Sequence, residues 1–247
     1  MVRPVSTSPA LDPWEHVART FEPARPSRWP TPGALARHLN PRTIQTPALD
    51  LIDQALVEAA ATPDARLIVT MAPQEGKSVR AAGDFPLWML TRNPDLRIIV
   101  ASYGQGLANR NGRSIRNRIV AHPELGLRVA PDNGAAGEWT IDGHEGGVYS
   151  VGIGGGITGR ACDLMVIDDP IKNRTEAESR VYRERVWSWW TDEASARLAP
   201  GAPAVLILTR WHHGDLAGRL LAEPGSPWRV LNIPAQADHR PEKCEAD

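Results

Sequence analysis

The chain has 247 residues, enough to bury one sizeable core as a single domain with short appendages. Its 42% hydrophobic and 23% charged residues are typical of a soluble globular protein, and no apolar run approaches the roughly 18–20 residues that a membrane helix needs. The net charge of −1 excludes a chain that is basic throughout, so any nucleic-acid contact must come from a local patch. Cys162 and Cys244 lack metal-ligand spacing, and we expect a reducing cytoplasm and no disulfide.

A loosely structured arm is expected over residues 1–43, which carry many Pro, Arg and Ser residues with weak periodicity. The stretch TPALDLIDQALVEAA then predicts a helix that Thr46 caps and Pro47 opens, with its apolar residues on one face. We expect residues 44–235 to form one domain and the polar residues 236–247 to be a linker cut short.

Four apolar runs of the kind found in buried strands follow along the chain. They are RLIVTM (66–71), LRIIVASY (96–103), DLMVIDD (163–169) and APAVLILT (202–209). Helices are expected from Lys77 to about Thr91 with a kink near Pro86, over 106–120, from a Thr175–Glu178 capping box to about Leu198, and over 214–222. EWTIDG and GGVYSVGI predict a hairpin or two short strands, and WRVLNIPA ends the regular part. This alternation predicts an α/β fold with a central, mostly parallel sheet flanked by helices.

The stretch MAPQEGKS (71–78) ends like a phosphate-binding loop. In G-x-x-x-x-G-K-[ST], backbone N–H groups wrap the phosphates, the lysine reaches the β and γ oxygens, and the hydroxyl holds Mg²⁺. Met71 replaces the first glycine, but the loop follows a buried strand and opens a helix, as a nucleotide site requires. The predicted ATP-binding residues of the loop are Gln74, Glu75, Gly76, Lys77 and Ser78.

Two adjacent carboxylates end the third apolar run, in LMVIDDP. A nucleotide hydrolase needs one carboxylate at the end of a neighbouring strand for Mg²⁺ and a second to orient the attacking water. We assign the metal to Asp168 and the water to Asp169. The alternative is a simple turn at the end of the strand, because Asp-Pro favours turns.

A glycine-rich segment, GGGITG (154–159), precedes these carboxylates. It formally fits the dinucleotide fingerprint, but it leads into a strand instead of a helix, and we reject that match. Arg160 follows it, nine residues before Asp169. Flexible glycines would let Arg160 reach a phosphate as an arginine finger, in its own site or in a neighbouring subunit; the alternative is a surface arginine.

Further candidates lie at the end of the fourth run and before the first helix. Thr209 and Arg210 leave the fourth run, where a polar residue can sense the γ-phosphate. Gln45 is a candidate for reading adenine, with a plain surface glutamine as the alternative. His212 and His213 have no partner cluster for a metal, and a structural role is favoured.

One segment, 97–118, is basic and contains no acidic residue. It either contacts DNA or forms a solvated helix face. Its arginines are Arg97, Arg110, Arg113, Arg116 and Arg118.

With these residues in place, the chain resembles the ATPase half of the large terminase subunit of tailed double-stranded DNA bacteriophages, the motor that packages viral DNA into a procapsid. The resemblance covers about Arg42 to Ala235. It rests on APQEGKS, ASYGQGLANRNGR, GGGITGRACDLMVIDDPIKNR and LILTRWHHGDLAGRLL, in that order. It implies a P-loop NTPase of the ASCE or RecA-like type. The family is known for a phosphate loop without the usual first glycine, which would explain Met71.

The resemblance also implies roles for single residues. Lys77 and Ser78 would bind phosphate and Mg²⁺, Asp168 would bind the metal, and Asp169 would take the place of a catalytic acid that is Glu in many members. Arg160 sits where some relatives carry a finger that acts in trans within a ring. Two further matches are the coupling motif at Thr209 and its neighbours, and, more loosely, the adenine-reading glutamine at Gln45.

The implied partners are double-stranded DNA, the portal protein, the small terminase subunit and further copies of the chain. The copies would form a pentameric ring on the procapsid in the host cell cytoplasm, away from any membrane, and the isolated domain could exist as a monomer. Family members also carry a C-terminal nuclease domain. Because the chain ends at Asp247, we expect it to be truncated and to lack nuclease activity.

Two other functions fit the same residues. The first is a helicase-like ATPase that remodels nucleic acid. The second is a nucleotide-gated module, in which slow hydrolysis switches the affinity for DNA or another partner. Stimulation of turnover by DNA separates the motor from the switch, and strand separation separates the helicase from the packaging motor.

Overall fold

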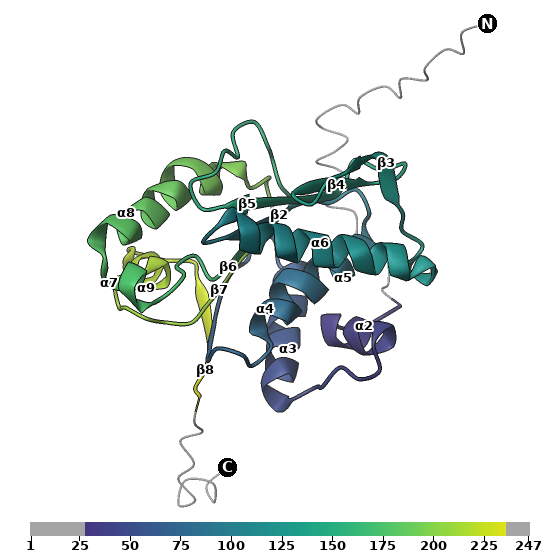
Figure 1. Ribbon diagram of the computed structural model, residues 1–247. Coiled ribbons are helices and arrows are strands. Elements are labelled where there is room, and N and C mark those ends of the chain that lie inside the picture. The colour runs from purple at the N-terminus through teal and green to yellow at the C-terminus, as the bar shows by residue number, and fades with distance from the viewer. Residues whose placement is uncertain (1–27, 236–247) are drawn as a thin grey trace, which may run out of the picture.

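An eight-stranded sheet runs through the computed structural model, which describes residues 28–235 (Figure 1). The strands are β1 (Arg66–Met71), β2 (Arg97–Ser102), β3 (Val129–Gly134), β4 (Glu138–Ile141), β5 (Gly147–Gly152), β6 (Leu164–Asp168), β7 (Ala204–Leu208) and β8 (Arg229–Ile233). Their order across the sheet is β3-β4-β5-β2-β6-β7-β1-β8. The six neighbouring strands β5, β2, β6, β7, β1 and β8 pair in parallel. At the other edge, β3 pairs with β4 and β4 pairs with β5 in antiparallel fashion. The mostly parallel sheet expected from the sequence is confirmed.

Helices cover both faces of the sheet (Figure 1). They are α2 (Pro32–Leu39), α3 (Pro47–Ala61), α4 (Lys77–Val79), α5 (Phe85–Arg92), α6 (Gln105–Ala121), α7 (Arg174–Glu178), α8 (Arg180–Ser188) and α9 (Leu216–Ala222). Because successive residues of a strand point to opposite faces, each central strand feeds two cores. In β1, Leu67 and Val69 enter the core under α2, α3, α5 and α6, and Ile68 enters the core under α7, α8 and α9. Among the described residues, no helix is long and apolar enough to cross a membrane.

The first expected helix forms as predicted. The hydroxyl of Thr46 accepts a hydrogen bond from the Leu49 N–H at 3.3 Å, and Pro47 occupies the first helical position of α3. A loosely structured arm that packs on another part of the protein is expected before it, but residues 32–39 form helix α2 with Leu35 fully buried. The Thr31 cap and the packing of α2 against α3 and α5 stabilise this segment. Residues 1–27 lie outside the described part of the chain.

Two expected helices are interrupted. After α4 the helix widens into a π-helical segment, Arg80–Asp84, where the Phe85 N–H donates to the Arg80 carbonyl five residues back. The π-helical segment lies just before Pro86. A proline has no N–H to donate to the carbonyl four residues before it, which favours an irregular helix at this point. The helix is therefore irregular near Pro86, where a kink was expected, but the irregularity is a π-helical segment.

The expected capping box at Thr175 and Glu178 is wrong. Asn173 caps α7 instead, because its side chain accepts a hydrogen bond from the Glu176 N–H at 3.0 Å. The helix ends at Glu178, and the chain continues through α8, a π-helical turn (Trp189–Ala194) and a 3-10 turn (Ser195–Arg197). The tryptophans at 189 and 190 are buried in the second core.

Candidate functional site

Three strand ends meet at one edge of the sheet and carry the predicted site. The phosphate loop follows β1, Asp168 ends β6 and is followed by Asp169, and Thr209 follows β7. Strand β7 lies between β6 and β1 and pairs in parallel with both. Thr209 therefore lies between the phosphate loop and the carboxylates.

Two residues of the phosphate loop have a left-handed backbone conformation, and one of them is a glycine. Gly76 has φ +87°, and Gln74, which is exposed in the loop, has φ +66°. The helical segment of residues 77–92 begins directly after Gly76, so its first N–H groups face the loop. Free N–H groups at a helix start bind phosphate.

Lys77 is 4% exposed and points toward the end of β7. Its Nζ donates to the Thr209 hydroxyl at 3.0 Å and lies 3.9 Å from the Asp169 carboxylate. The Thr209 hydroxyl in turn donates to the Met71 carbonyl at 3.3 Å, and the Thr209 N–H donates to Asp169 Oδ1 at 3.1 Å. One threonine thus contacts the phosphate loop, its lysine and the second carboxylate.

Asp168 is 1% exposed. Its Oδ2 accepts a hydrogen bond from the side-chain amide of Asn111 at 3.0 Å, whereas its buried Oδ1 has no hydrogen-bond partner among the described residues. Burial raises the pKa of the Asp168 carboxyl, and the neighbouring Asp169 charge raises it further, while Ser78, Asn111 and Lys77 oppose that rise. A bound cation would stabilise the charged carboxylate and give Oδ1 a partner.

Asp169 turns the chain sharply after β6, with φ +44°. Its N–H donates to the Ile207 carbonyl, and its own carbonyl accepts from the Tyr103 N–H, which anchors the turn to both neighbouring strands. The side chain of Asp169 remains 32% exposed, so its carboxylate is accessible to water.

A cavity of about 600 Å³ opens beside these groups and is lined by Ser78, Asp168 and Asp169. Mg²⁺ prefers oxygen ligands and is usually bound by one or two protein oxygens plus substrate phosphates. The unpartnered Asp168 Oδ1 and the Ser78 hydroxyl fit that ligand set. A site of this kind needs no cluster of three or more His, Cys, Asp or Glu side chains, and the described residues contain none.

Arg160 is not brought to the phosphate loop of its own chain. Its guanidinium forms two hydrogen bonds with Glu138, at 2.6 and 3.0 Å, and stacks 4.0 Å from the Tyr149 ring centroid. These residues line a separate cavity of about 280 Å³ that contains no residue of the phosphate loop. The Arg160 side chain is 40% exposed, and action in trans stays a prediction.

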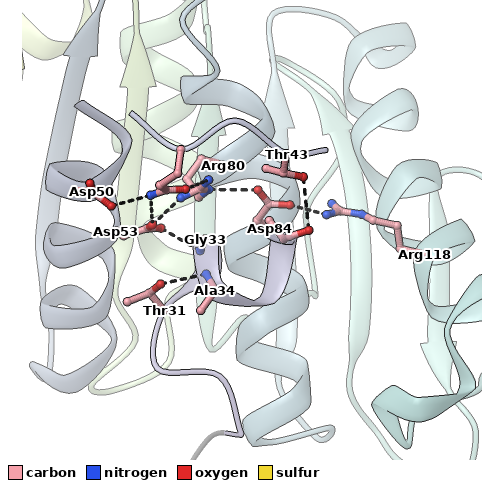
Figure 2. A network of polar contacts seen from close by, with 11 residues as sticks. Thr31, Gly33, Ala34, Thr43, Asp50, Asp53, Arg80, Asp84 and Arg118 are labelled. Carbon is pink, nitrogen blue, oxygen red and sulfur yellow. Dashed lines mark hydrogen bonds and ion pairs between the residues drawn. The ribbon is translucent and has the colours of Figure 1, made fainter. Parts of the chain in front are cut away.

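Gln45 belongs to a polar network with Asp53 and Arg80, whose side chains are buried. Figure 2 shows the other members of this network. Its amide nitrogen donates to Asp50 at 2.8 Å and Asp53 at 2.9 Å, and its oxygen accepts from Arg80 at 2.9 Å. Both ends of the side chain are engaged. Reading adenine would require exchange of at least one of these bonds for a base, so this role stays a prediction.

Arg210 pairs with Asp215, near the start of α9. Its Nε donates to Asp215 at 2.6 Å, and Asp215 also caps α9 through the Gly218 N–H at 2.8 Å. Of the two residues predicted to sense the phosphate, the structure places only Thr209 in contact with the loop.

The basic segment 97–118 does not form one patch. Arg97 is paired with Asp163 and Arg118 with Asp84, while Arg116 donates to the Gly134 carbonyl. Arg110 and Arg113 are exposed on α6 and have no ion pair in the part of the chain that the structure describes. They are the remaining candidates for contact with a polyanion.

Two residues of this region were not predicted from the sequence. Asn111 contacts the Asp168 carboxylate, and Asp53 joins the buried network. Each is a polar residue flanking the apolar stripe of its helix, three or four positions from buried neighbours. That placement is the signal that would have marked them.

The loop, the two carboxylates at the end of β6 and the strand inserted between β6 and β1 define a P-loop nucleotide-binding fold of the ASCE type. The family model described as terminase large subunit, T4likevirus-type, N-terminal, matches residues 68–243. The chain therefore belongs to the terminase large subunit family.

Relatives agree with this assignment. The terminase large subunit of Enterobacteria phage T3 is 31% identical over 111 residues, which cover 42% of this chain and 19% of that protein. The HK97 bacteriophage large terminase shares the fold with a TM-score of 0.53 and 14% identity, over 82% of this chain and 42% of that one. A mutant ATPase domain of the Thermus phage P74-26 large terminase has a TM-score of 0.51 and 15% identity, over 87% of this chain and 90% of that domain. The chain thus spans less than half the length of the first two relatives.

Proposed function

We propose that this chain is the ATPase motor domain of a viral terminase large subunit, which hydrolyses ATP to drive double-stranded DNA into a procapsid. The observation that carries the proposal is the contact of Lys77 and Asp169 with the same residue, Thr209, at the meeting point of three strands. Loss of a phosphate beside Lys77 would change a contact of Thr209, which gives hydrolysis a direct route to the end of β7.

Each site residue has a role in this proposal. Lys77 would bind the phosphates, and Asp169 would orient the attacking water and accept its proton. Mg²⁺, held by Ser78 and Asp168, would neutralise the charge that develops on the phosphate oxygens. Gln74, Glu75 and Gly76 would supply the loop around the phosphates.

Arg160 would complete the site of a neighbouring subunit. Its exposure and its distance from its own loop along the sheet favour action in trans within a ring of copies, pentameric in the assembled motor. The pairing with Glu138 would then have to open, and an exposed ion pair costs only about 0.2–1 kcal/mol to break.

The proposal is tested by steady-state ATP hydrolysis over a wide range of protein concentration, with and without double-stranded DNA. Asp169→Asn serves as the blank. We expect specific activity to rise with concentration, because subunits complete each other's sites, and to rise further with DNA. A rate equal to the blank under all conditions would refute the motor. Hydrolysis without any response to DNA would favour a nucleotide-gated switch.

Arg110 and Arg113 are expected to contact the DNA backbone. Replacing both by Ala should weaken DNA binding at every sequence tested and reduce the slope of log affinity against log salt by about 2 units, since each phosphate contact contributes about 0.9. Fluorescence anisotropy with a labelled duplex measures this. Arg128→Ala, which removes an exposed arginine paired with Asp142 outside α6, is the control and should leave the slope unchanged. An unchanged slope in the double variant would exclude this face.

The remaining partners follow from the same proposal. The portal protein, the small terminase subunit and the procapsid would be the assembly partners in the host cell cytoplasm.

A further inference from the structure

We propose that Asn111 is a positioning residue for the metal-binding carboxylate, fixing the rotation of Asp168 so that Oδ1 faces the cation. This inference rests on the proposed function, because it concerns the same Mg²⁺ site. Asn111 lines the same cavity as Ser78, Asp168 and Asp169, and it would act on the metal through its hydrogen bond to Asp168.

The hydrogen bonding of Asp168 is one-sided. Asn111 Nδ2 donates to Oδ2 at 3.0 Å, while Oδ1 is buried without a partner among the described residues. A carboxylate with one oxygen held and one free has a defined direction of approach for a cation. Hydrogen-bonded partners that orient a metal ligand typically account for 10- to 100-fold in metal affinity.

Asn111 is presented by a helix that is clamped to the sheet. At the next residue, the Gly112 carbonyl accepts a hydrogen bond from Trp139 Nε1 at 3.1 Å. A Cβ at Gly112 would lie 2.1 Å from the Ser150 hydroxyl, so α6 approaches β5 as closely as only glycine allows. The start of α6 is tied to the same strand, because Gln105 donates to the Ser150 carbonyl at 2.7 Å and accepts from the Gly152 N–H at 3.0 Å.

These contacts fix the position of α6 along its axis and its rotation relative to the sheet. Ala108 and Ile115, on the flanks of Asn111, are fully buried, so the helix cannot turn about its axis without exposing them. A side chain on a fixed helix loses little entropy on forming one defined hydrogen bond. The amide at 111 is thus preorganised toward Oδ2 before any ligand binds.

The experiment is a Mg²⁺ titration of the binding of a fluorescent ADP analogue, which reads metal binding without turnover. We expect Asn111→Ala to raise the Mg²⁺ concentration at half-effect by about 10-fold or more, and to leave the affinity in EDTA unchanged. Asn117→Ala is the matched control: it makes the same substitution on the exposed side of α6, where Asn117 contacts only the Arg116 side chain in the described structure. It should behave as the wild type.

A second measurement separates positioning from a general effect on the fold. In an Asp168→Asn background, Asn111→Ala should cause no further shift, because the carboxylate through which Asn111 acts is gone. An unchanged Mg²⁺ midpoint in Asn111→Ala, an equal loss of binding in EDTA, or additive effects with Asp168→Asn would each overturn the inference. A wild-type chain that binds the analogue in neither condition would refute the proposed function, and the role of Asn111 with it.

Discussion

Lys77→Ala abolishes ATP hydrolysis, with an expected loss of at least about 100- to 1,000-fold in kcat. Lys77 is the one lysine at the site, and its ammonium group is held by Thr209 and Asp169 without bulk water around it. In such a place a positive charge stabilises the transferring phosphoryl group far more than it would in water. Alanine removes that charge and leaves the loop backbone in place, so nucleotide binding should weaken while the fold persists.

The control for this variant is Lys172→Ala, which removes the other described lysine, an exposed one. Its rate should equal that of the wild type. The inactive Lys77→Ala chain still carries an intact Arg160, and an Arg160→Ala chain still carries an intact phosphate loop. Mixing the two should therefore restore part of the activity if the arginine acts in trans. Full activity of Lys77→Ala would refute the site, and no recovery on mixing would place Arg160 outside the neighbour's reaction.

Arg80→Ala is expected to cost about 3–5 kcal/mol of unfolding free energy, the largest stability effect of any substitution proposed here. Arg80 is 2% exposed, and its guanidinium contacts Asp53 on α3 and Asp84 on its own π-helical segment (Figure 2). It also contacts Gln45, which precedes α3. Its loss leaves two buried carboxylates with fewer positive partners. Burial already raises the pKa of Asp84, and Arg118 and Arg80 oppose that rise.

Urea unfolding measures this effect, with Arg110→Ala as the control. Arg110 loses the same atoms from an exposed position, and its substitution should change stability by no more than about 0.5 kcal/mol. Arg80→Lys should fall between the two, because an ammonium group keeps the charge but cannot reproduce the planar fork. A cost for Arg80→Ala no larger than that for Arg110→Ala would show that the network does not stabilise the fold.

The prediction for Arg80 also bears on the site. Arg80 opens the π-helical segment two residues after Ser78, and Gly33 closes over the network from α2, where a Cβ would lie within 2.3 Å of both Asp53 and Arg80. The network therefore ties the helix that carries the phosphate loop to α2 and α3. The segment before residue 43, expected to be a loose arm, is in part a support for the nucleotide site.

Most of the fold could be predicted from the sequence. Apolar runs such as RLIVTM and DLMVIDD became β1 and β6 because strands buried on both faces carry their signal in consecutive residues. Strand β3 was missed, since VAPDNG contains a proline, an aspartate, an asparagine and a glycine, all rare in strands. Its pairing with β4 at the sheet edge compensates for that composition.

The sequence by itself determined the phosphate loop, the paired carboxylates and Thr209, because each is a local pattern at the end of a recognisable strand. Only the tertiary structure decided which side chains meet. Asn111 and Asp168 are 57 residues apart, and Arg80 and Asp53 are 27 apart. Arg160 and Glu138 face each other because β4 and β5 fold back at the edge of the sheet. Such contacts depend on the order of the strands and on the rotation of each helix, which hydrophobic periodicity along the chain does not encode.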